Sequence, residues 1–299
     1  MSIIVPSSIE IPKGVSSSAD AIRCARLDWE VTKEQLFFVD NYSQRYVVDG
    51  MATVRRDPNG DVKPLGVVGL DYQPVQNIEA FRFFDNIVQS GEAEYVKAGS
   101  LKGGKKIWIM AKLTCNSLLI DGKDSVDMYV VLVNGHCGNH SISVMITPVR
   151  IMCSNMLTTA IRKSAGIINF RHTKNIAEQI KYSDIVFNAI TKESNELIER
   201  MSFLQNRRMD MLDFEEYVRT LLVDSKKVDE LFIRAKDIYN NNKNDMLGCT
   251  WYRGYQAFIE YIDWHVNYRT EESRLNSIWF GKSRRMKEDA LELALDRAR

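Results

Sequence analysis

The sequence predicts an α+β fold, in which an antiparallel β-meander sheet with a helix packed on one face is followed by an α-helical C-terminal half. Segments with the two-residue period of strands dominate the chain up to about residue 150, and segments of helical period dominate the rest. Glycine-containing turns separate the strand-like segments. Strands first and helices second favour α+β over a parallel α/β sheet.

The N-terminal part is predicted to consist of short strands around one helix. Residues 1–18 are rich in Ser, Pro and Gly and are expected to form a flexible arm. A short helix is expected over 19–27, and strands over 27–31, 36–39, 46–48, 51–54 and 65–72. Asp49-Gly50 predicts a two-residue hairpin turn. Asn77 is expected to cap a helix that ends at Gly91.

The meander itself is predicted from four strand-like segments, over 95–101, 105–113, 126–133 and 141–149. In the second segment Ile107 and its alternates are apolar, whereas Lys106, Trp108 and Lys112 alternate with them. In the fourth segment Met145 and its alternates fall on the more polar side. We therefore expect one covered face and one open face, with Trp108 exposed between two lysines.

The helical half is predicted from apolar spacing after Pro148. Helices are expected over 153–162, 176–190, 197–204, 214–223, 228–239, 251–266 and 286–298. No internal repeat is visible. The expected organisation is an arm over 1–18, a sheet domain over 19–170 and a helical region over 171–299.

Charge is unevenly distributed along the chain. The formal net charge is only +1, but residues 95–177 hold eleven Lys and Arg against three Asp. That segment is therefore +8 and the remainder is −7. Such asymmetry indicates a polyanionic partner for the middle of the chain. The alternative is that the basic residues are scattered over several faces of the sheet.

Nucleic acid is the polyanion that the side chains favour. The Lys102–Lys106 segment differs from a P-loop, because a strand follows it and its spacing is wrong, but a lysine-rich hairpin tip can still contact phosphates. Trp108 is a candidate for base stacking, unless a helix or subunit covers it. The predicted nucleic-acid-binding residues are Lys97, Lys102, Lys105, Lys106, Trp108, Lys112, Arg150, Arg162, Lys163, Arg171, His172 and Lys174.

A metal site is the competing interpretation of the His136-Cys137-Gly138-Asn139-His140 segment, which holds three candidate ligands. Zinc sites normally have four ligands, and the spacing does not show that Cys153, His172 or His265 completes this one. No nucleophile motif surrounds Cys137 or Cys153. We therefore predict no metal, no cofactor and no catalytic residue.

The cellular compartment is predicted from cysteines and hydropathy. Five cysteines without a C-x-x-C pair are typical of a reduced, cytosolic protein. The N-terminal segment lacks the pattern of a signal peptide. No apolar run approaches the roughly 20 residues that span a bilayer. We expect a cytoplasmic protein with no membrane association.

The segment LGVVGLDYQPVQNIEAF over 65–81, with AGSL over 98–101 and TPVRIMCSN over 147–155, resembles the phage/plasmid-like protein family, domain of unknown function 932. Further matches are LDW over 27–29, RHT over 171–173, the run from Thr250-Trp251 through Tyr261, and WFG over 279–281. The resemblance extends from about residue 20 to the end. It implies a bacterial cytoplasmic protein of phage, prophage or plasmid origin, and it carries over no catalytic residue.

The strand–helix–meander order is also similar to that of single-strand annealing proteins of the Rad52 type, in which a β-hairpin and a sheet hold DNA in a ring of subunits. We therefore expect a non-enzymatic protein that binds nucleic acid, single-stranded DNA in particular, during recombination or replication, as a homo-oligomer. The alternatives are a metal-dependent enzyme built on His136 and His140, a nucleotide-processing enzyme, and a phage protein that binds a host factor.

Overall fold

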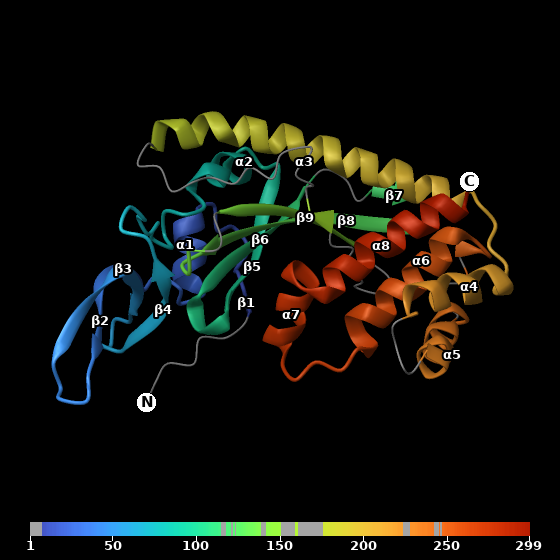
Figure 1. Ribbon diagram of the computed structural model, residues 1–299. Helices are drawn as coiled ribbons and strands as arrows, with labels where there is room; N and C mark the ends of the chain where they lie inside the picture. Colours follow the sequence, from blue (N-terminus) through green and yellow to red (C-terminus); the bar gives the residue numbers. More distant parts are fainter. Residues whose placement is uncertain are drawn as a thin grey trace. The chain divides into compact units, whose positions relative to one another are not determined.

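The computed structural model describes residues 8–114, 118–120, 122, 124–138, 142–150, 159–160, 176–223, 228–241, 245 and 247–299. The strands are β1 (Ile9–Glu10), β2 (Glu30–Val39), β3 (Arg45–Arg56), β4 (Val62–Val68), β5 (Ala93–Leu101), β6 (Lys106–Leu113), β7 (Leu118–Ile120), β8 (Asp124–Gly135), β9 (Ser143–Arg150) and β10 (Thr159–Ala160) (Figure 1).

The helices are concentrated in the C-terminal half, which confirms the α+β prediction. They are α1 (Ser18–Cys24), η1 (Arg82–Phe84), α2 (Asp85–Gln89), η2 (Lys102–Gly104), α3 (Ile176–Gln205), α4 (Met211–Leu221), α5 (Val228–Tyr239), α6 (Trp251–Glu260), η4 (Tyr261–His265), α7 (Glu271–Phe280) and α8 (Lys282–Arg297). None of the described helices is long and apolar enough to cross a bilayer.

The chain divides into two compact units. The first contains residues 1–115, 130–145 and 161–189, and the second contains residues 116–129, 146–160 and 190–299. Both units draw on separated stretches of sequence. The sequence analysis expected consecutive regions over 19–170 and 171–299, whereas each unit combines three separated stretches of the chain.

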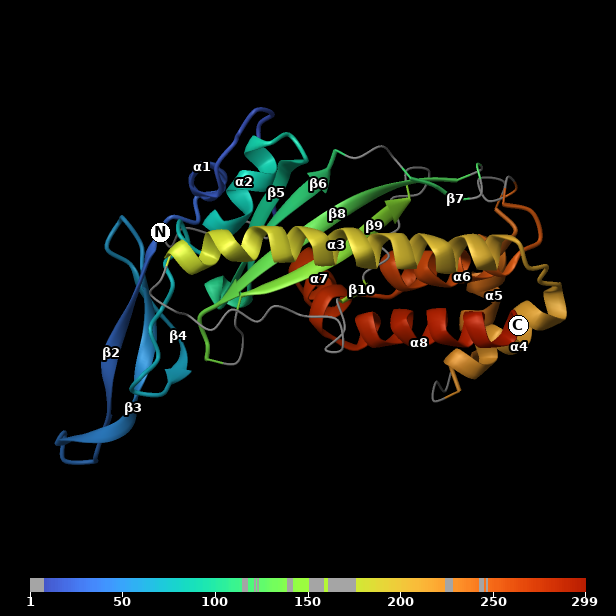
Figure 2. The ribbon, with the colours of Figure 1, turned by 90° about the horizontal axis from the view of Figure 1, so that it is seen from above.

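The larger sheet has the strand order β1-β5-β6-β8-β9-β10 within the described residues, and β7 pairs with β8. Pairing is antiparallel between β1 and β5, β5 and β6, and β7 and β8. Strand β1 lies within the segment expected to be a flexible arm. Helices α1 and α2 pack against β5 (Figure 2).

A single carboxylate joins α1 and α2 to β5. Asp85 Oδ1 accepts hydrogen bonds from the backbone N–H of Ser18 at 2.7 Å and from the Tyr95 hydroxyl at 2.8 Å. Burial raises the pKa of Asp85, and burial next to this carboxyl raises the pKa of Tyr95 well above its usual value. The hydrogen bonds therefore position the helices on the strand they cover.

The prediction of an open face on the larger sheet is wrong at β6 and β9. Lys106 is 2% exposed, Trp108 1% and Met110 7%, and in β9 Met145 is 4% and Thr147 0% exposed. Both faces of these strands are covered. The alternation in the sequence could not show this, because Trp and Met are apolar and a lysine stem can be buried while only its amine remains polar.

The smaller sheet has the order β2-β3-β4, and its pairs are antiparallel. The predicted turn at Asp49-Gly50 is wrong, since β3 runs without interruption through both residues. Gly50 has φ +123°, and the register of β3 against β2 shifts beside it. A glycine with positive φ is found in β-bulges as well as in turns, and Asp49-Gly50 lies at a bulge in this structure.

The turn of this hairpin lies instead between Val39 and Arg45. Asp40 Oδ1 accepts hydrogen bonds from the backbone N–H groups of Tyr42 and Gln44, both at 2.9 Å. Asp is favoured in turns because its carboxylate can accept such local bonds.

The helix expected to start at Asn77 is wrong as well, because only the short η1 and α2 form before Gly91. The side chain of Asn77 is fully engaged elsewhere. Its Nδ2 donates to the Leu27 carbonyl at 2.6 Å, and its Oδ1 lies 2.7 Å from His136 Nε2. A cap residue used in tertiary hydrogen bonds cannot also cap a helix.

The second unit is built around α6, whose residues are all buried. Thr250 caps α6 by accepting the N–H of Arg253, and the Tyr217 hydroxyl of α4 donates to the Ala290 carbonyl of α8 at 2.9 Å. The aromatic spacing predicted a helix here, with one apolar face, but both its apolar and its polar side chains are buried. Its end differs from the expected single helix, because a π-helical turn, η4, follows at Tyr261.

A buried ion pair links η4 to α8. Asp263 and Lys287 pair with each other, and their side chains are 0% and 1% exposed. Burial lowers the pKa of Lys287, while Asp263 acts in the opposite direction. Two charges removed from water must be compensated by each other, so the pair is required once both residues are in place.

We expect Lys287→Met to lower the free energy of unfolding by about 3–5 kcal/mol, because it leaves the Asp263 carboxylate buried without its cation. Denaturant unfolding of the second unit measures this. Lys282→Met on the same helix, at an exposed position, is the matched control and should change stability by less than about 0.5 kcal/mol. Adding Asp263→Leu to Lys287→Met should recover most of the loss. An undiminished loss in the double variant would contradict the ion-pair explanation.

Candidate nucleic-acid interface

Two of the predicted lysines meet at an exposed turn between β5 and β6. This lysine turn, Lys102–Lys105, has positive φ at Lys102, Gly103 and Gly104 (55°, 68° and 99°), and both lysines are exposed. Glycine tolerates such angles at no steric cost, so Gly103-Gly104 allows the tight reversal. The predicted hairpin tip is therefore present, and it carries two exposed lysines.

The lysine turn is held in place by the root of the smaller sheet. A Cβ on Gly104 would lie 3.2 Å from Trp29 Cζ2 and 3.3 Å from Arg55 Nη1, so the glycine backbone packs directly on this pair. The Arg55 guanidinium lies 4.5 Å from the Trp29 ring centroid, and its Nε donates to Asp57 Oδ1 at 2.7 Å. This buried stack leaves the turn little freedom.

The other described lysines of the predicted set do not join the turn. Lys97 lies along β5 and is 3.7 Å from Glu10, which offsets its charge. Lys112 is half-buried and lies opposite Glu94 in the pairing of β5 with β6. It is seven residues from Lys105, or about 23 Å along an extended strand. Lys106 and Trp108 are buried, as described above. The structure thus brings together Lys102 and Lys105.

The remaining predicted residues contribute nothing to the described site. Arg162, Lys163, Arg171, His172 and Lys174 lie outside the described residues. Arg150 ends β9, but its side chain is not among those described. A role for these residues in binding nucleic acid therefore stays a prediction.

Burial lowers the pKa of Lys106 to about 8, and the nearby Lys102 acts in the same direction, whereas Cys137 acts in the opposite one. Tyr72 is half-buried and donates its hydroxyl to the Gly135 carbonyl at 3.2 Å, and burial raises its pKa to about 12. Neither group presents a free face to a ligand strand.

His136, a candidate metal ligand, forms the centre of a hydrogen-bonded junction. Its backbone N–H donates to Lys105 O at 2.9 Å, its carbonyl accepts from Thr53 Oγ1 at 2.6 Å, and its Nε2 meets Asn77. The Trp29 ring packs edge-on at 5.7 Å. We call these residues the His136 junction. A ring nitrogen engaged by Asn77 in a fully buried residue has a structural role.

Cys137 follows at the surface and is half-buried, while His140 lies outside the described residues. Strand β4 lies directly on Cys137, because a Cβ on Gly66 would be 2.7 Å from Cys137 Cα. Within the described part of the chain, no three His, Cys, Asp or Glu side chains are grouped to hold a metal ion.

The most exposed apolar surface lies on the β2–β3 hairpin, and the sequence reasoning missed it. No residue from Gln35 to Asp49 is buried. We call residues 35–49 the aromatic arm. Its large exposed side chains are Phe37 (47%), Phe38 (55%), Val39 (53%), Tyr42 (86%), Tyr46 (43%), Val47 (75%) and Val48 (39%). In Figures 1 and 2 the arm extends away from the larger sheet of its unit.

The two faces of the aromatic arm differ. Phe38 pairs with Tyr46 across the strands, and their rings stack at 4.9 Å with planes 14° apart. On the other face Phe37 pairs with Val47, and the Arg45 guanidinium lies 4.8 Å from the Phe37 ring centroid. Apolar runs such as Phe37-Phe38-Val39 indicate a buried strand, so only their exposure in the structure identifies them as a surface.

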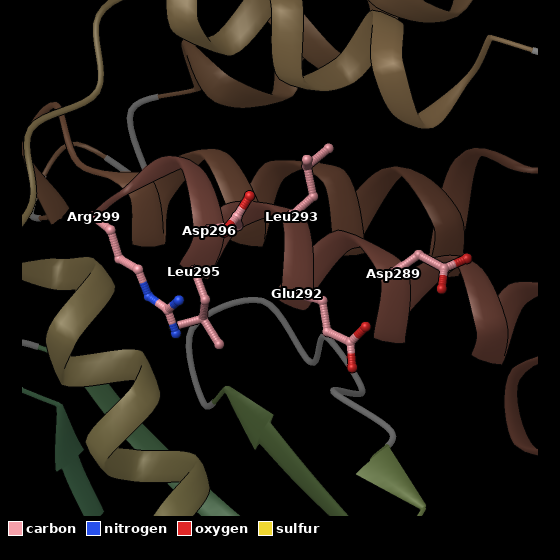
Figure 3. A pocket seen from close by; sticks show the side chains of 6 residues that line it. All are labelled: Asp289, Glu292, Leu293, Leu295, Asp296 and Arg299. Carbon is pink, nitrogen blue, oxygen red and sulfur yellow. The ribbon is translucent and has the colours of Figure 1, made fainter.

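A shallow hollow on α8 has a composition unsuited to nucleic acid. Figure 3 shows its lining of Asp289, Glu292, Leu293, Leu295, Asp296 and Arg299. Three carboxylates against one guanidinium would repel phosphates. These side chains therefore add nothing to the candidate interface.

Comparison with known families gives one match. The family described as "Domain of unknown function (DUF932)" matches residues 64–279. The chain belongs to this family. The matched region begins in β4 and ends in α7. It includes the lysine turn and the Asn77 and His136 part of the His136 junction, but leaves out Trp29, Thr53 and the aromatic arm. Neither the curated proteins nor the solved structures contain a match to this DUF932 protein.

We expect Gly66→Ala to lower the free energy of unfolding by about 1–3 kcal/mol, because the added methyl group overlaps the backbone of Cys137. Denaturant unfolding is the measurement. Gly69→Ala is the matched control, since its Cβ would meet nothing within 4 Å. Equal stabilities of the two variants would show that β4 does not lie on Cys137.

Lys106 should give the protein a pH-dependent stability. Its pKa is about 8 in the folded chain and 10.5 in its ordinary state, so between these values the unfolded chain binds more protons. The free energy of unfolding should therefore rise with pH across this window. Lys106→Met should lose that rise, whereas Lys105→Met should keep it. Parallel pH profiles for wild type and Lys106→Met would contradict the burial of an ionisable amine.

Proposed function

We propose that this DUF932 protein is a non-enzymatic nucleic-acid-binding protein whose preferred ligand is single-stranded DNA. The observation that carries the proposal is the lysine turn. Lys102 and Lys105 are both exposed, three residues apart on one turn, and the backbone of that turn packs on the Trp29–Arg55 stack. A turn whose backbone is already ordered loses little further conformational freedom when its lysines contact phosphates.

The charge of the chain supports the same proposal. The +8 segment includes the lysine turn, and its basic residues outside the described part would extend the contact surface. Lys106 and Trp108 are left out of the proposed contacts because they are buried. Phage or plasmid origin, a cytoplasmic location, action in recombination or replication, and assembly into a homo-oligomer belong to this proposal.

We expect single-stranded DNA to bind in a salt-dependent manner, and Lys102→Glu with Lys105→Glu to weaken it. Each lost phosphate contact should reduce the slope of log affinity against log salt by about 0.7, so the pair should reduce it by about 1.4. Fluorescence anisotropy of a labelled oligo-dT at several salt concentrations measures both quantities.

The matched control is Lys192→Glu with Lys282→Glu, which makes the same change of net charge at exposed positions in the second unit. It should leave the slope at the wild-type value. The proposal fails if wild type does not bind at low salt, or if the two double variants behave alike.

A second candidate is an interaction protein that binds a host factor. Val39 and Val47 on the aromatic arm are exposed by 53% and 75%, as expected for a surface that another protein covers. Under this function, DNA binding would be weak and the lysine-turn variant would not change it selectively.

A further inference from the structure

The aromatic arm exposes large apolar side chains that no other described part of the chain covers. Its outer part is a two-stranded ribbon with exposed aromatic and aliphatic side chains on both faces. Contiguous exposed apolar surface of this kind marks interaction sites in soluble proteins. The question is which of its two faces binds, and what.

We propose that the Phe38–Tyr46 face of the aromatic arm binds unpaired nucleobases by stacking. This inference rests on the proposed function. The lysine turn would contact the phosphates of a DNA strand, and the arm would bind bases of the same strand. The two rings are nearly parallel, and the residues that carry them, Phe38 and Tyr46, are 55% and 43% exposed. Every base has a π-face, so such a platform is indifferent to sequence.

The platform is held in position before any ligand arrives. The Tyr46 hydroxyl lies 3.1 Å from Gln44 Oε1 and 3.2 Å from Asp40 Oδ2, and Asp40 also fixes the turn. These contacts orient the Tyr46 ring against Phe38. A rigid aromatic surface loses little entropy on binding, which favours ligand stacking over rearrangement.

Two carboxylates of the hairpin, Asp40 and Glu34, are already engaged. Asp40 accepts the turn hydrogen bonds, and Glu34 is paired with Arg56 at 2.5 Å. On the opposite face, the Arg45 guanidinium already covers Phe37 at 4.8 Å. The Phe38–Tyr46 face therefore combines exposed rings with few competing interactions, which is why we assign the bases to it.

The distance along the arm sets the length of strand required. Nine residues of β3 separate Arg55, beside the lysine turn, from Tyr46, which corresponds to about 30 Å in an extended strand. About nine nucleotides at 3.4 Å each cover that distance. The test therefore uses an oligo-dT longer than this, with one 2-aminopurine, a fluorescent base whose emission falls when it stacks.

Phe38→Leu is the decisive variant, because it keeps apolar volume and removes the π-face. In the full-length protein we expect it to weaken oligo-dT binding by about 5- to 100-fold and to abolish the 2-aminopurine quenching. Its salt slope should equal that of wild type, since no phosphate contact is lost. Phe38→Tyr should bind like wild type, and adding the protein to a duplex of the same length should not change its 2-aminopurine emission.

Phe37→Leu is the matched control, with the same substitution on the opposite face. It should bind like wild type, and an equal loss in Phe37→Leu and Phe38→Leu would overturn the assignment to one face. If Phe38→Leu binds normally while the lysine-turn variant is weakened, the stacking inference fails and the proposed function stands. If neither variant is weakened, both fail.

A protein partner gives a different result. If the arm binds a second copy of this chain, Phe38→Leu should leave DNA affinity unchanged, and Phe38→Asp should lower the mass measured by sedimentation. That outcome would overturn the base-stacking inference.

Discussion

The first unit depends on one hydrogen-bonded residue, His136. Its backbone and ring together contact the lysine turn, β3 and the loop that carries Asn77. Four segments far apart in the sequence therefore meet at a buried polar group. Buried polar groups must find partners, so each of these hydrogen bonds is costly to lose. The exposed features of the unit, the lysine turn and the aromatic arm, are both anchored at this point.

Local patterns predicted what depends on local chemistry. Gly103-Gly104 indicated the turn between β5 and β6 because few residues other than glycine tolerate positive φ. The aromatic spacing of α6 predicted its buried helix. The α+β class followed from the order of the two periods, which is a property of the sequence alone.

Tertiary contacts decided the rest, and the sequence contained no signal for them. A tryptophan in a strand can lie in the core or on the surface. Trp108 is buried because the second face of the sheet is also covered. Asp49-Gly50 has the composition of a turn but forms a bulge in β3. Asn77 is a residue type that caps helices, but its side chain bonds His136 instead. The exposure of Phe37-Phe38-Val39 is likewise a property of the assembled unit, so the sequence alone could not identify the aromatic arm as a surface.

The bulge at Gly50 separates β3 into two parts with different constraints. Met51–Arg56 pair with both β2 and β4, whereas Arg45–Val47, on the other side of the bulge, pair with β2 alone among the described strands. Side chains at the tip touch no core, so substitutions there meet no packing penalty from the rest of the unit. The outer arm can therefore diverge rapidly between related proteins, and change what it recognises, while the residues that anchor it remain the same.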